Sequence, residues 1–227
     1  MKLYQYQPIS KYTIQNLLLQ KIWGANPKSF NDPFEFVVRD SYRITKDGKV
    51  QPFSTDEKRV MTQIKEGISN FGVTCFSESG DIILLWSHYS SNHTGMCLTF
   101  EIEDPLPKNL FKVEYTHVFP DIVGDVKKDF FKYLITKGKS WEYEREHRLI
   151  FTKGVGHYPY PGKLLEITLG CKTSQTDIES IFRICDYIFD NQILLSKTEI
   201  DLNSFQLSIG TIYRNKGEPV PKYWAHK

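Results

Sequence analysis

The sequence has 227 residues, 40% hydrophobic and 25% charged, a composition that excludes a disordered chain. Its 29 Lys and Arg residues against 27 Asp and Glu give a formal net charge of +2, so a nucleic-acid partner is unsupported, although not excluded. No apolar run approaches the roughly 20 residues of a membrane span, and the polar N-terminal residues are unlike a secretion signal. We therefore expect a cytoplasmic protein without a membrane partner.

Hydrophobic spacing and turn residues predict strands and helices along the whole chain. In chain order, the first half is expected to contain a strand at 3–7, a helix capped by Thr13, a strand at 21–26, a polar hairpin around 47–48, a helix at 54–70, a strand at 72–77 and a short helix at 81–89. The second half is expected to contain strands at 96–102 and 111–115, a helix at 125–137, strands at 144–152 and 164–169, a helix at 174–189, and strands at 193–199 and 205–209.

This order of elements predicts an α+β fold with a curved, mixed or mostly antiparallel sheet flanked by about four helices. We expect a single domain over residues 1–227, with a tail loosely attached from about residue 211. The sequence contains no glycine-rich phosphate loop, which disfavours a Rossmann dehydrogenase or a P-loop NTPase. The four cysteines, at 75, 97, 171 and 185, lack metal-site spacing and are expected to be buried free thiols.

The first string with potential chemistry is S-F-N-D-P-F-E. Asn31 and Asp32 before a proline favour a turn, which Phe30 and Phe34 are expected to pin to the core. The alternative is that Asn31, Asp32 and Glu35 converge on a hydroxyl or amide of a ligand. The residues alone leave both interpretations open.

The second string is L-W-S-H-Y-S-S-N-H-T-G, which concentrates hydrogen-bonding side chains beyond the needs of a core helix. Turn chemistry explains its second half. It does not explain Trp86, His88 and Tyr89, and at least one of these is expected to face a ligand. His88 and His93 are five residues apart, off-register for one helical face, so we do not expect a metal pair.

The third string is W-E-Y-E-R-E-H-R-L-I. In a strand, Glu144, Glu146 and Arg148 would share one face, where two carboxylates repel unless a cation offsets them. One interpretation is an ion-paired strand edge. The other assigns one Glu to a sugar hydroxyl or to general-base work. At least one of the two carboxylates is expected to be buried beside Arg148.

These strings resemble a bacterial family, domain of unknown function 2971, which has no established activity. Its patterns LYxYxP, IWxxxPxxFNDPFE, CFSExxxxxxLWSHYxxNHxGxCLxF, WxYExExRLI and LGxxxS are matched in this sequence at 3–6, 22–35, 75–100, 141–150 and 169–170. One departure is His147, where the family more often has an aromatic Tyr or Trp.

The layout is also similar to that of ADP-ribosyltransferases, in which aromatic rings stack on nicotinamide and a late Glu bonds a ribose hydroxyl. The R-S-E and H-Y-E orders of that superfamily are not found. The resemblance implies transfer of ADP-ribose from NAD, which would be a substrate, with no metal. The implied catalytic residues are Glu146, Glu144 and His88, and the implied ligand-binding residues are Tyr4, Tyr6, Asn31, Asp32, Trp86, Tyr89 and Arg148.

Two alternatives stay open. The protein could bind a nucleotide or another small ligand without turning it over, or it could be a metal-assisted nuclease using Asp32, Glu35, Glu144 and Glu146. The sequence does not determine the oligomeric state. If the three strings form one site, Asn31, His88 and Glu146 are expected to lie around one cleft.

Overall fold

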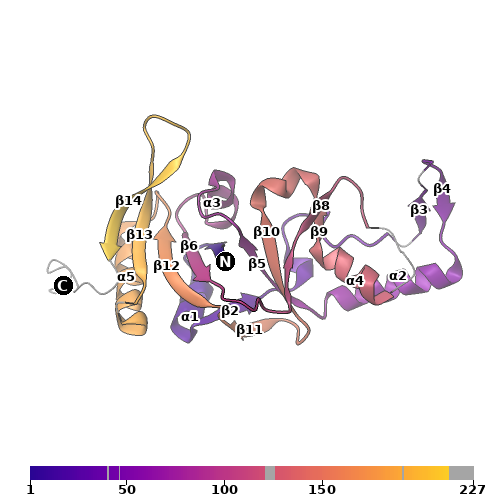
Figure 1. Cartoon of the computed structure of the whole chain (residues 1–227), viewed down its shortest axis with the longest axis horizontal. Helices are drawn as coiled ribbons and strands as arrows, with labels where there is room; N and C mark the ends of the chain where they lie inside the picture. The colour runs from indigo at the N-terminus through magenta and orange to yellow at the C-terminus, as the bar shows by residue number, and fades with distance from the viewer. Residues whose placement is uncertain (40, 46, 121–125, 191, 215–227) are drawn as a thin grey trace. The chain divides into compact units, whose positions relative to one another are not determined.

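The computed structural model describes residues 1–39, 41–45, 47–120, 126–190 and 192–214 (Figure 1). It forms two compact units, each assembled from separate stretches of chain. Unit 1 contains Met1–Ile22, Phe76–Pro107 and the chain from Pro159 onward, and unit 2 contains Trp23–Cys75 and Lys108–Tyr158. Helices combined with a mixed sheet confirm the predicted α+β class. The single-domain assignment stays a prediction.

The sheet of unit 1 is mixed, as predicted. Its strands are β1 (Lys2–Gln7), β6 (Met96–Glu101), β12 (Lys163–Leu169), β13 (Leu194–Ile200) and β14 (Leu207–Arg214). Strand β6 lies between β1 and β12 and is antiparallel to both, whereas β12 and β13 are parallel. Strand β14 pairs antiparallel with β13. On the other side of β1, Tyr4 pairs with Ser77 at the end of β5 (Gly72–Ser77).

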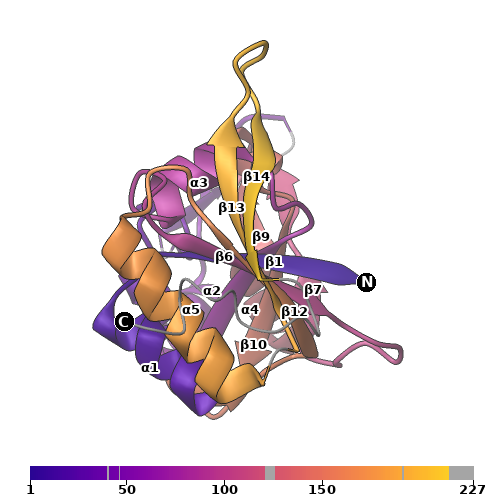
Figure 2. The same ribbon diagram turned by 90° about the vertical axis from the view of Figure 1, so that its left-hand side faces the viewer.

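Two helices of unit 1, α1 (Lys11–Leu19) and α5 (Gln175–Phe189), lie side by side next to this sheet (Figure 2). Helix α5 makes the crossover that two parallel strands require. Its buried residues recur at helical spacing: Ile178, Ile181, Phe182 and Cys185. Helix α1 is capped by Ser10 and not by Thr13, because Thr13 is the third helical residue of a capping box with Ser10.

Unit 2 contains short strand pairs and two helices that share a core. The strand pairs are β3 (Tyr42–Ile44) with β4 (Val50–Pro52), β7 (Leu110–Lys112) with β10 (Glu146–Phe151), and β8 (Glu114–Thr116) with β9 (Thr136–Gly138). Most residues of β2 (Lys21–Gly24) and β11 (Gly156–Pro159), which pair with each other, fall at the edge of this unit, at 23–24 and 156–158. Helices α2 (Thr55–Ile68) and α4 (Val126–Ile135) pack together over a buried cluster that includes Met61, Ile64 and Leu134. The β3–β4 pair confirms the predicted hairpin.

Several predicted boundaries are wrong, two of them at the third string and at the C-terminal end of the described residues. The strand predicted from 144 begins at Glu146, because Lys139–Glu144 forms the 3-10 helix η2 and Arg145 takes a left-handed conformation with φ of 47°. Strand β14 runs to Arg214, beyond the predicted start of the tail, and residues 215–227 lie outside the described residues. Within the described ranges, no helix is long and apolar enough to cross a membrane.

Candidate functional site

Five charged side chains meet in the interior of unit 2, and we call them the charge cluster: Glu35, Lys137, Glu144, Glu146 and Arg148. Their side chains are at most 5% exposed. Charged groups are rarely buried to this degree unless they are paired, and here each one faces an opposite charge. The charge cluster brings Glu35, from the first string, together with the charged residues 144, 146 and 148 of the third string.

A turn positions Glu35. The carboxylate of Asp32 accepts a hydrogen bond from the backbone N–H of Phe34 at 2.9 Å, and the N–H of Glu35 donates to the carbonyl of Asp32 at 3.1 Å. Asp32 is therefore engaged in the predicted turn, while Asn31 is exposed. The expectation for Phe34 is wrong, because its side chain is 68% exposed. Phe36 takes its place, with a ring 5.2 Å from that of Phe30.

Arg148 holds two carboxylates. Glu146 and Arg148 are two residues apart on β10 and therefore project from the same face. The Nε and Nη2 atoms of Arg148 lie 2.7 and 3.0 Å from the two oxygens of Glu146, and Nη2 lies 2.5 Å from Oε2 of Glu35. A third nitrogen, Nη1, donates to the carbonyl of Leu134 at 2.9 Å. This geometry is the two-pronged contact that guanidinium groups make with carboxylates.

Lys137 contacts all three carboxylates. Its Nζ lies 2.9 Å from Oε1 of Glu35, 2.5 Å from Oε2 of Glu144 and 3.2 Å from Oε2 of Glu146. Three carboxylates against two cations leave the cluster with one formal negative charge. Carboxylates held by cations in this way do not form the open oxygen site that a metal-assisted nuclease needs.

The ionisation of Glu146 is controlled by opposing effects. Burial raises the pKa of its carboxyl group, but the charges of Arg148 and Lys137 outweigh burial and lower this pKa to about 2. The thiol of Cys75 also donates a hydrogen bond to Glu146, and burial raises the pKa of that thiol. The prediction of a carboxylate buried beside Arg148 is confirmed by Glu146. Its low pKa keeps this carboxylate ionised at neutral pH.

The lowered pKa of Glu146 predicts how stability depends on pH. A carboxyl group whose pKa is lower in the folded protein stabilises it above the unfolded pKa, near 4.5, and this contribution is lost as the pH falls toward about 2. We expect on the order of 3 kcal/mol to be lost over that interval. Urea unfolding at several pH values measures it. The free energy of unfolding of Glu146→Gln should fall less steeply over this pH interval than that of the native protein. Parallel curves of this free energy against pH for the two proteins would contradict the lowered pKa of Glu146.

Aromatic rings border the cluster. The hydroxyl of Tyr115 accepts a hydrogen bond from the N–H of Glu146 at 2.8 Å. Trp141 and Tyr143, which we call the aromatic pair, are partly exposed, and their ring centroids are 6.0 Å apart. The Nζ of Lys137 lies 5.0 Å from the centroid of the Trp141 ring. The aromatic pair thus lies on the partly exposed side of a buried charged site.

The predicted residues of unit 1 form a separate arrangement. The hydroxyl of Tyr6 donates to the carbonyl of Ser79 at 3.0 Å, and its ring meets that of Trp86 edge-on at 5.3 Å. Trp86 is fully buried and donates its indole N–H to the carbonyl of Gly80 at 3.0 Å. Both side chains therefore anchor the loop before α3 (Ile83–Tyr89). Their ligand-binding roles stay predictions.

The other three predicted residues of unit 1 have more solvent contact. Tyr4 is partly exposed, His88 is exposed on α3, and Tyr89 is partly exposed with its ring 6.2 Å from that of His88. Asn31 and Glu146 belong to unit 2 and His88 to unit 1, so the common cleft stays a prediction.

Sequence reasoning missed Lys137 and the aromatic pair. The only signal for Lys137 was indirect, because carboxylates expected on one face require a cation nearby. Comparisons of the chain with protein-family models, curated proteins and solved structures gave no match. Both resemblances noted from the sequence therefore stay predictions.

Proposed function

We propose that this protein transfers ADP-ribose from NAD to an acceptor, with the charge cluster and the aromatic pair as its reaction site. The observation that carries this proposal is the formal charge of −1 in a buried site bordered by partly exposed aromatic rings. The nicotinamide ring of NAD is a cation. An aromatic cation matches both the excess negative charge and the rings of Trp141 and Tyr143.

The same charge suits the reaction. When the bond between the anomeric carbon and nicotinamide breaks, its electron pair goes to nicotinamide and the ribose becomes an oxocarbenium-like cation. A fixed carboxylate stabilises that cation more than it stabilises the substrate. The nucleophile of the acceptor then bonds to the anomeric carbon, and its proton passes to a carboxylate or to solvent.

Within the cluster we assign this carboxylate to Glu144. Both oxygens of Glu146 are held by Arg148, and Oε2 of Glu146 also faces Lys137. Glu144 is paired with Lys137 and is adjacent in sequence to Tyr143, whose hydroxyl has a pKa raised by burial and by the charge of Glu144. Lys137 and Arg148 act as positioning residues in this proposal.

The test is to mix the purified protein with NAD and to measure binding by calorimetry and nicotinamide release by chromatography, alone and with cell extract as a source of acceptor. We expect release, and weaker binding of NADH, because its reduced nicotinamide ring is uncharged. Binding without release would favour the non-catalytic nucleotide-binding alternative. Equal affinity for NAD and NADH would contradict the charge argument, and neither binding nor release would remove the proposal.

A further inference from the structure

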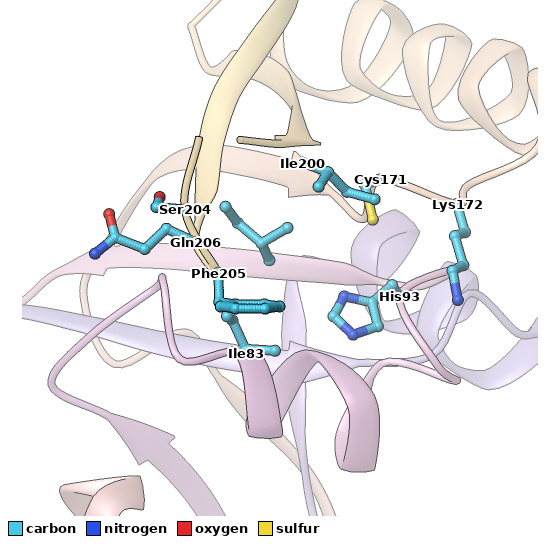
Figure 3. A pocket seen from close by; sticks show the side chains of 9 residues that line it. Ile83, His93, Cys171, Lys172, Ile200, Ser204, Phe205 and Gln206 are labelled. Atoms are coloured by element: carbon cyan, nitrogen blue, oxygen red, sulfur yellow. The ribbon is translucent and has the colours of Figure 1, made fainter. Parts of the chain in front are cut away.

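Unit 1 contains a pocket of about 240 Å³ that has no part in the charge cluster (Figure 3). It is formed by the turn between β13 and β14, the start of α3, the loop before β6 and the loop after β12. An apolar cavity of roughly 150 Å³ accommodates benzene, so this pocket has room for an aromatic ring with a short side arm.

One end of the pocket is apolar. Phe205 and Ile83 face each other there (Figure 3). Leu207 and Ile200 add further apolar surface to the lining. The turn that carries Phe205 is braced by Asp201, whose carboxylate accepts hydrogen bonds from the N–H of Asn203 at 2.8 Å and from the hydroxyl of Ser204 at 2.6 Å. Bracing of this kind holds the turn in place before a ligand arrives, which lowers the entropic cost of binding.

The other end of the pocket is polar and basic. His93 and Lys172 lie there next to Cys171 (Figure 3). The backbone of His93 is fixed on both sides, since its N–H donates to the carbonyl of Trp86 at 3.1 Å and its carbonyl accepts from the N–H of Lys172 at 2.9 Å. The lining residues include no Asp or Glu, so the charge of Lys172 is not offset within the wall.

The imidazole of His93 provides a second indication of a ligand. Its Nδ1 atom is shielded from solvent and has no hydrogen-bond partner among the described residues. Buried polar atoms without partners are uncommon in folded proteins. Burial and the nearby charge of Lys172 lower the pKa of His93, which favours the neutral ring with one donor and one acceptor nitrogen.

We infer that this pocket binds a small molecule with a flat apolar body and one carboxylate group. The apolar body would lie between Phe205 and Ile83, and the carboxylate would face Lys172 and His93. This inference is independent of the proposed transfer reaction, because it uses residues of unit 1 alone.

The test compares phenylacetate with phenylacetamide, which has the same shape without the charge, by calorimetry on the full chain. We expect phenylacetate to bind about fivefold more tightly, because Lys172 is exposed and an exposed ion pair contributes modestly. Lys172→Gln should abolish this preference, and Lys163→Gln, at an exposed lysine of β12, should retain it. Addition of phenylacetate should shift the imidazole proton signals of His93.

Phe205→Ala tests the apolar wall. The side chain of Phe205 is fully exposed, so its removal should leave the fold intact. It should weaken the binding of both phenylacetate and phenylacetamide. Equal affinities for the two compounds in the native protein would overturn the assignment of a carboxylate. Absence of saturable binding, or binding that neither Lys172→Gln nor Phe205→Ala alters, would overturn the site.

Discussion

Glu144→Gln is expected to lower nicotinamide release from NAD by a factor of about 10² to 10³. Glutamine keeps the shape of the side chain but removes the charge that opposes the developing ribose cation. Because that interaction is made mainly in the transition state, NAD affinity should change little while kcat falls. Initial rates over a range of NAD concentrations separate the two quantities.

Glu142→Gln is the matched control. Glu142 lies two residues earlier in η2, its side chain is 55% exposed, and it pairs with Lys139 at 2.6 Å. This variant should retain the native rate. A full rate in Glu144→Gln would show that Glu144 is not the carboxylate of the reaction, even if the native protein releases nicotinamide. An equal loss in both variants would show that the effect is not specific to the charge cluster.

Lys137→Met is expected to lower the free energy of unfolding by about 3–5 kcal/mol. Methionine keeps much of the length of the side chain, but three buried carboxylates then lose the cation that they share. The loss is large because a buried charge without its partner lacks both water and an ion pair. Urea unfolding at pH 7 measures the difference.

Lys139→Met is the control for this change, because Lys139 lies two residues away, is 41% exposed and contacts a single carboxylate. Its effect should be at most about 1 kcal/mol. The difference in free energy of unfolding between Lys137→Met and Lys139→Met should become smaller below about pH 4, because protonation there neutralises the carboxylates that have lost their cation. Equal effects at pH 7 would contradict the role of Lys137 in the cluster.

The elements that the sequence predicts well are those with strong local signals. The spacing of Ile178, Ile181 and Phe182 identifies α5 without any tertiary information. The segment before β10 was misjudged because its alternating charges are typical of a strand. A left-handed residue, Arg145, ends η2 there, and an arginine gives little indication of such a conformation.

The candidate site was only half predictable for a related reason. Glu146 and Arg148 are close in sequence, so strand alternation was sufficient to place them together. Lys137 reaches them through the packing of β9, and nothing in its neighbouring residues distinguishes it from the exposed Lys139. Trp86 is one of three residues of which at least one was expected to face a ligand, and it is buried with its indole N–H donated to the carbonyl of Gly80. A tryptophan that anchors a loop and one that binds a ligand have the same local sequence, so its role stays a prediction.

The distance along the chain between Glu35 and Arg148 also sets the order of events during synthesis. Their hydrogen bond joins residues 113 positions apart. At about 5–20 residues per second, Glu35 is added to the chain roughly 6 to 23 seconds before Arg148. Throughout that interval the carboxylate of Glu35 lacks the guanidinium group of Arg148. The interior of unit 2 therefore closes late in translation, and a nascent chain arrested before residue 148 cannot complete it.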